Sequence, residues 1–236
     1  MNVVSVWLFG IMRKANSPMI NGSCLVHVIV VLCALSAGPS WAWTSVNGPL
    51  TDDIHQKAID RVLTSMSPGD RKVLDDQQPL VDKDQEPLKS AEHAMTGIDK
   101  VGELDGDQKK AYILLCESLL QKEMTSAIEA RRANKFPVAL PALGKAIHTL
   151  EDATSPAHRG FQIWSYNFGI WEMAKHIFKE RVYPDDSTAD RYRGHLEGVV
   201  QYAYDIYMEK VPMPARYFDP ATGNLALPPS YLFPLH

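Results

Sequence analysis

The chain carries the segment HTLEDATSPAH at residues 148–158. His148 and Asp152 are four residues apart, so on a helix both side chains leave the same face, one turn apart. Pro156 then ends the helix, which allows His158 to fold back toward that face. Imidazole and carboxylate are ligand types of zinc sites that activate water. The segment therefore predicts a metal site or, in a simpler interpretation, a helix end with a surface histidine.

Apolar residues on both sides of this segment recur at helical spacing. A first helix is expected after the acidic cap Thr51-Asp52-Asp53, and Ser67-Pro68-Gly69 is expected to stop it. Further helices are predicted at 108–133, 136–152, about 163–181 and 187–210.

The remaining stretches lack this periodicity. Residues 70–107 are acidic, which predicts a long loop with one or two short helices, and the proline-rich last 25 residues predict an extended tail on the surface. No run of alternating β-branched residues is long enough to build a sheet. We therefore predict an all-α protein, a single-domain multi-helix bundle.

Residues 1–42 differ in composition from the rest of the chain. They contain two basic residues and no acidic ones, and the apolar stretch at 25–38 is shorter than the roughly 20 residues that span a bilayer. A basic start, a short apolar run and small residues before Ala42 are typical of a cleaved signal peptide. We expect a secreted or periplasmic protein whose mature domain, 43–236, begins at Trp43; an uncleaved anchor is the alternative.

Charge and cysteine content limit the possible functions. The whole chain has a net charge of −4, and removal of residues 1–42 would leave 22 basic against 28 acidic side chains. This acidic balance disfavours a groove for nucleic acid. Of three cysteines only Cys116 lies in the expected mature chain, so no intramolecular disulfide could form there. The core, bound metal or both would have to stabilise the exported protein.

Three further elements contain side chains of metal-ligand type. His176 and Glu180 are four residues apart on an expected helix, although such a pair is commonly a solvated helix face. Asp82 precedes Glu92-His93 in what reads as an acidic loop. His55 lies beside the apolar stripe of the first helix, where a lone histidine is more often a core residue than a ligand.

Together with cleavage after Ala42, these elements resemble the zinc-dependent phospholipase C and P1/S1 nuclease superfamily. Its members are all-α, exported phosphodiesterases with a trinuclear zinc site, in which an N-terminal tryptophan binds metal. The H-x3-D-x5-H spacing of His148, Asp152 and His158 matches that family's central motif. His176 and Glu180 match its following H-x3-[ED] pair, and the segment HQKAIDRVL from His55 looks like the one with its first histidine.

The resemblance implies three zinc ions. Trp43, through its α-amine and carbonyl, and His55 would bind one. A second would be held by Asp82, His93 and His148, with Asp152 bridging the two, and a third by His158, His176 and Glu180. Asp75, Asp76 or Asp84 could replace Asp82. The catalytic residues would be Asp152, which holds the two ions that generate hydroxide, and Asp82, as a general base.

The same resemblance implies a zinc-dependent phosphoric-ester hydrolase, and specifically a phospholipase C that removes phospholipid head groups. A P1/S1-like single-strand nuclease or 3′-nucleotidase is the first alternative, although family nucleases tend to be longer and to carry disulfides. A non-catalytic, metal-stabilised helical binding protein is the second. We expect a monomer that acts on phospholipid or another phosphodiester, touches membrane surfaces transiently and has no stable nucleic-acid partner.

Overall fold

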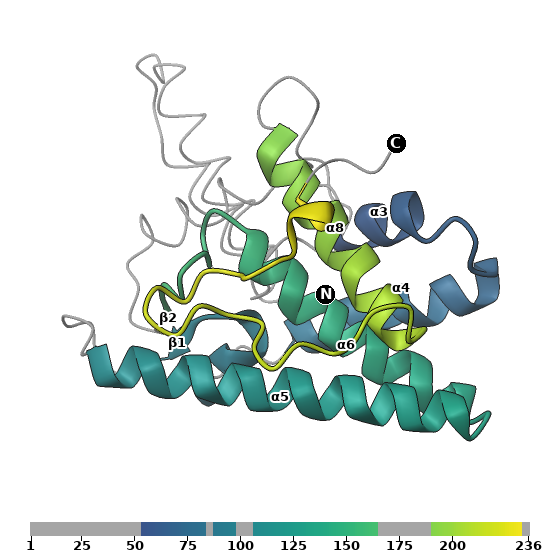
Figure 1. Ribbon diagram of the computed structural model, residues 1–236, viewed down its shortest axis with the longest axis horizontal. Coiled ribbons are helices and arrows are strands. Elements are labelled where there is room, and N and C mark those ends of the chain that lie inside the picture. The colour runs from purple at the N-terminus through teal and green to yellow at the C-terminus, as the bar shows by residue number, and fades with distance from the viewer. Residues whose placement is uncertain (1–52, 84–86, 98–105, 165–189, 233–236) are drawn as a thin grey trace, which may run out of the picture. The chain divides into compact units, whose positions relative to one another are not determined.

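The computed structural model describes residues 53–83, 87–97, 106–164 and 190–232, all within one compact unit, Pro39–His236. Helices dominate these residues (Figure 1). They are α3 (Ile54–Val62), α4 (Pro68–Asp82), α5 (Gly106–Arg132), α6 (Phe136–Thr154) and α8 (Asp190–Tyr207), with short 3₁₀ helices η1 (Pro87–His93) and η2 (Pro229–Tyr231). The prediction of a mainly helical protein is confirmed for the described residues, in which no helix is long and apolar enough to span a membrane.

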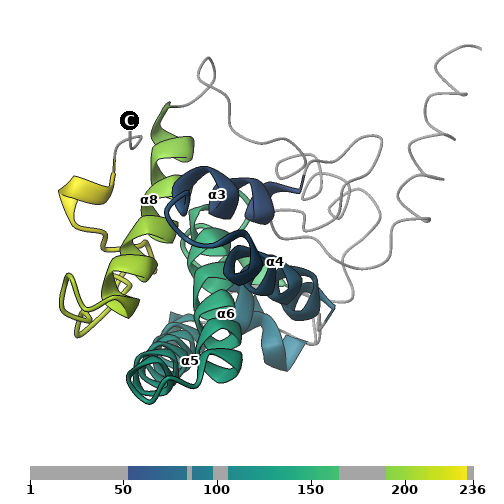
Figure 2. The same cartoon turned by 90° about the vertical axis from the view of Figure 1, so that its right-hand side faces the viewer.

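Helix α6 lies at the centre of the packing. It contacts α5, α4 and α8, which surround it in Figure 2. From residue 146 to its end every side chain is buried, as expected for a helix covered on all sides. It passes through Pro141 without interruption and ends before Ser155. The predicted helix at 136–152 is therefore confirmed and extends two residues further.

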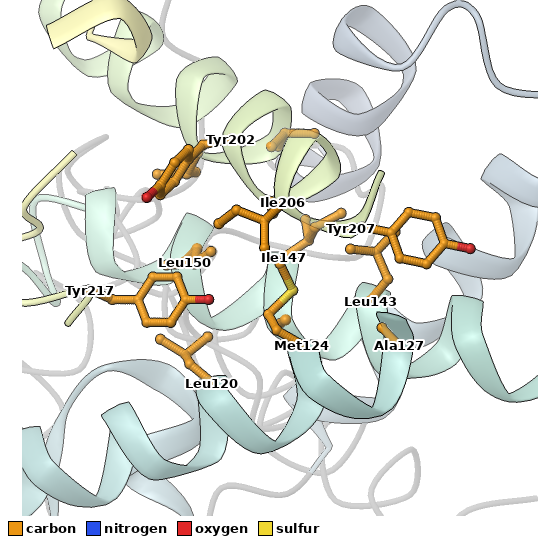
Figure 3. Packing of buried hydrophobic residues seen from close by; sticks show 14 of the residues in the cluster. Leu120, Met124, Ala127, Leu143, Ile147, Leu150, Tyr202, Ile206, Tyr207 and Tyr217 are labelled. Atoms are coloured by element: carbon orange, nitrogen blue, oxygen red, sulfur yellow. The ribbon is translucent and has the colours of Figure 1, made fainter. Parts of the chain in front are cut away.

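The hydrophobic core is one cluster to which α3, α4, α5, α6 and α8 all contribute side chains. Figure 3 shows the part where side chains of α5, α6 and α8 meet, among them Met124, Ile147 and Ile206. Cys116 is buried in the same cluster on α5, and burial raises the pKa of its thiol well above the usual range. This position gives Cys116 a packing role in the core.

The prediction of a long loop at 70–107 is wrong for its first part, because α4 occupies it. Ser67 caps this helix by accepting a hydrogen bond from the Asp70 amide, and Pro68 occupies its first turn. The motif that was expected only to stop α3 therefore also starts α4. The buried side chains of α4 lie on one helix face, and two of the four are polar: Leu74, Gln78, Val81 and Asp82. A search for apolar periodicity therefore misses this face.

Two short strands form a parallel pair, β1 (Thr96–Gly97) and β2 (Ile163–Trp164). Strand β2 occupies the start of the predicted 163–181 helix, and the rest of that prediction lies outside the described residues. The Thr96 hydroxyl also donates to the Phe161 carbonyl at 3.1 Å. These contacts hold the end of η1 beside the segment that follows α6.

The C-terminal segment is more than a surface tail. Tyr217 and Phe218 are buried, and their amides donate to the carboxylate of Glu117 on α5 at 2.7–3.0 Å. Near its end the segment passes so close to α8 that a Cβ at Gly198 would lie 1.7 Å from the Tyr231 carbonyl oxygen. The prediction of a tail on the surface is thus wrong for Tyr217 and Phe218.

Candidate metal centre

Five buried side chains of metal-ligand type meet around α6. They come from α3, the end of α4, the end of η1 and α6 itself: His55, Asp82, His93, His148 and Asp152. Each is at most 3% exposed. They form two overlapping groups, His55 with His148 and Asp152, and Asp82 with His93 and His148. Within each group one potential ligand atom from every residue lies within 4.8 Å of the others.

Asp152 lies between three imidazoles. Its Oδ1 is 3.4 Å from His55 Nε2, whereas Oδ2 is 2.8 Å from His93 Nδ1 and 3.1 Å from His148 Nε2. One carboxylate oxygen therefore faces His55, and the other faces His93 and His148. Asp82 completes the second group, with Oδ1 3.4 Å from His148 Nε2.

These distances and donor atoms fit a metal ion. Two ligands that each lie 2.0–2.1 Å from a tetrahedral zinc ion are about 3.3 Å apart, and the separation of 3.4 Å between His55 Nε2 and Asp152 Oδ1 is close to that value. Both atoms are buried, and neither forms a hydrogen bond with any described residue. Buried polar atoms usually have partners, so a cation between these two would remove an unfavourable arrangement.

The electrostatic environment favours, at Asp152 and His148, the protonation states that a metal ligand needs. Burial alone would raise the pKa of Asp152, but His148, His55 and His93 hold it well below its usual range, so this carboxylate stays ionised. Burial lowers the pKa of His148, which keeps its imidazole neutral. Metal ligands need these two states, an anionic carboxylate and an imidazole with a lone pair.

His55 behaves differently from His148. Burial alone would lower its pKa, but Glu151 and Asp152 raise that pKa well above the usual range. Without metal, a proton on His55 therefore compensates the nearby carboxylates. A bound cation would take over this role and displace the proton.

The remaining predicted ligands are not part of either group. His158 is buried with Nδ1 2.7 Å from the His93 carbonyl oxygen, but it belongs to neither group of the described residues. Trp43, His176 and Glu180 lie outside those residues. Among the alternative aspartates, the structure places Asp82 in a ligand group and leaves Asp75 and Asp76 out of both groups. Asp84 lies outside the described residues.

Two buried polar residues beside the histidines were not predicted. Glu151 Oε2 is 2.8 Å from His55 Nδ1, and Gln78 Oε1 is 3.1 Å from His148 Nδ1. Gln78 lies four residues before Asp82, so helical spacing could have indicated it had α4 been predicted. Glu151 directly precedes Asp152 and offered no such signal.

Asp75, on the same helix as Gln78, leads to a prediction about pH. Burial and the carboxylates of Asp60, Asp53 and Asp76 raise the pKa of Asp75 to about 7. The folded state therefore binds more protons than the unfolded chain between about pH 4 and 7, and stability falls as pH rises through that window. Asp75→Asn should raise the free energy of unfolding at pH 8 by about 1 kcal/mol, a value reduced for solvent screening. Urea unfolding should show no increase in the free energy of unfolding of Asp75→Asn over the wild type at pH 4.

Comparison with known proteins gave no relatives for this chain. No protein-family model, no curated protein and no solved structure matches it.

Proposed function

We propose that this protein is a zinc-dependent phosphodiesterase, and specifically a phospholipase C with the fold of the phospholipase C and P1/S1 nuclease superfamily. The observation that carries the proposal is the position of Asp152, whose two oxygens face His55 on one side and His93 and His148 on the other. A carboxylate in this position suits a bridge between two metal ions. Buried ligands from α3, α4, η1 and α6 add support, because such a cluster is costly unless a cation compensates it.

The proposed ligands divide between three ions. His55 and Asp152 would hold the first, together with the α-amine of Trp43 after cleavage of the leader. The second would be bound by Asp82, His93, His148 and Asp152. His158, His176 and Glu180 would complete a third. We propose zinc because its usual donors include neutral imidazole and carboxylate.

The bound zinc, Asp152 and Asp82 would each have a separate role in hydrolysis. Bound zinc would activate water and neutralise charge on phosphoryl oxygens. Asp152 would keep two ions at a fixed separation through its two oxygens. Asp82, whose Oδ1 lies 3.4 Å from His148 Nε2, would accept a proton from the attacking water if it acts as the general base. No serine or cysteine nucleophile is required.

The test combines metal analysis, N-terminal sequencing and substrate assays on the exported protein. We expect close to three zinc ions per chain, an N-terminus at Trp43, and phospholipid hydrolysis that a chelator abolishes and added zinc restores. Faster cleavage of single-stranded DNA or a 3′-nucleotide would favour the nuclease alternative. Full metal content without hydrolysis of any of these substrates would favour a binding protein, and a protein without metal would contradict the proposal.

A further inference from the structure

Two buried side chains contact the metal-facing histidines from behind. Glu151 on α6 and Gln78 on α4 are both 0% exposed. Glu151 contacts Nδ1 of His55, and Gln78 contacts Nδ1 of His148. In each case the other ring nitrogen, Nε2, faces Asp152. The two histidines thus have the same arrangement, with a carboxyl group behind His55 and an amide group behind His148.

The contacts of Gln78 determine which proton His148 carries. The Gln78 amide nitrogen donates to the carbonyls of Leu74 at 2.9 Å and Gly144 at 3.3 Å. The amide oxygen must therefore face His148, which has to donate from Nδ1. The lone pair of His148 is then on Nε2, 3.1 Å from Asp152 Oδ2 and 3.4 Å from Asp82 Oδ1.

Close packing of two helices makes the Gln78 contact possible. A Cβ at Gly144 of α6 would lie 3.0 Å from Gln77 Cβ of α4, closer than real Cβ contacts normally are. The absence of a side chain at residue 144 lets α4 approach α6, so that Gln78 reaches both the Gly144 carbonyl and His148. Gln78 is therefore fixed by three contacts within the core.

Glu151 determines the state of His55 in a similar way. In the metal-bound state, where a cation offsets its charge, an ionised Glu151 could only accept hydrogen bonds, so His55 would donate to it from Nδ1 across the 2.8 Å contact. Nε2 of His55 is then directed at Asp152 Oδ1, 3.4 Å away. A carboxylate behind an imidazole also makes that imidazole a stronger metal donor than an amide does.

We propose that Glu151 and Gln78 are positioning residues of the metal centre, which hold His55 and His148 in the tautomer that presents Nε2 to the metal ions. This inference rests on the metal centre of the proposed function. Partners behind metal-binding histidines fix the ring and the tautomer, and their loss typically lowers metal affinity about 10–100-fold. We expect a loss of this size for one zinc ion in Glu151→Leu and also in Gln78→Leu.

The experiment measures zinc affinity of the full exported chain by competition with a chromophoric chelator. Glu151→Gln is the rescue variant, because its amide oxygen can accept from His55 as Gln78 accepts from His148, and it should retain most of the affinity that Glu151→Leu loses. Glu117→Gln is the matched control, a buried glutamate whose carboxylate binds the amides of Tyr217 and Phe218. We expect this control to lower the melting temperature and to leave zinc affinity unchanged.

A second readout needs no metal. Ring nitrogen chemical shifts of the metal-free protein should show His148 protonated at Nδ1 in the wild type and a mixture of tautomers in Gln78→Leu. Folded Leu variants with wild-type zinc affinity and an unchanged His148 tautomer would overturn the inference and leave the proposed function intact. A Glu151→Gln variant as weak as Glu151→Leu would also overturn it, because Glu151 would then act as a ligand or by its charge. A wild-type chain without zinc would instead remove the metal centre itself.

Discussion

Asp152→Asn is expected to lose bound zinc and to lower phosphodiester hydrolysis by about 10³-fold or more, since several kcal/mol of metal-based stabilisation would be lost. The carboxylate faces His55 through Oδ1 and both His93 and His148 through Oδ2. Asparagine has nearly the same shape, but it has one oxygen, no charge and an NH₂ group that cannot bind a cation. On one side of residue 152 the proposed metal ion would therefore lose an oxygen ligand. On the other side the oxygen ligand would remain but without its negative charge.

Asp75→Asn is the matched control for this variant. It makes the same chemical change on α4, at a residue that belongs to neither ligand group. Zinc content by mass spectrometry and the initial rate of phospholipid hydrolysis should stay at wild-type values in Asp75→Asn and fall together in Asp152→Asn. An Asp152→Asn protein with both full zinc and full activity would show that Asp152 does not bridge metal ions.

Local patterns predicted α6, the helix that carries two of the five candidate ligands, and its long neighbour α5. The apolar spacing of residues 108–133 and 136–152 predicted α5 and α6, which run over Gly106–Arg132 and Phe136–Thr154. The i,i+4 spacing of His148 and Asp152 predicted that both would face one side of a helix, and in the structure their side chains are 3.1 Å apart. Short-range geometry of this kind depends only on the helical repeat.

The features that sequence analysis missed depend on contacts between distant residues. Gln78 and His148 are 70 residues apart, and His55 and Glu151 are 96 residues apart. The buried face of α4 mixes Leu74 with polar Gln78, so its role becomes visible only once α6 packs against it. Likewise, the buried Tyr217 and Phe218 donate their amides to Glu117, about 100 residues earlier in the chain. Neither periodicity nor composition contains such information.

Removal of metal is expected to lower the melting temperature by roughly 10 °C or more. The candidate ligands come from α3, α4, η1 and α6, so bound ions would link segments far apart in the chain without disulfides. An ion present at about 1,000 times its dissociation constant adds about 4 kcal/mol. For a chain of this size each kcal/mol corresponds to roughly 2–4 °C. Calorimetry with and without chelator measures the difference.

The difference in melting temperature between the metal-bound and the metal-free protein should widen between pH 6 and pH 9. The pKa of His55 is raised in the metal-free fold, so its contribution to stability is present below the unfolded value near 6.5 and is lost as pH rises through the folded value. Burial raises the pKa of Glu151 to about 8, which also lowers metal-free stability as pH rises toward that value. Metal binding strengthens over the same range because it competes with protons for the ligands. Equal melting temperatures with and without chelator, or a difference that narrows at pH 9, would mean that protons rather than metal ions compensate this buried cluster.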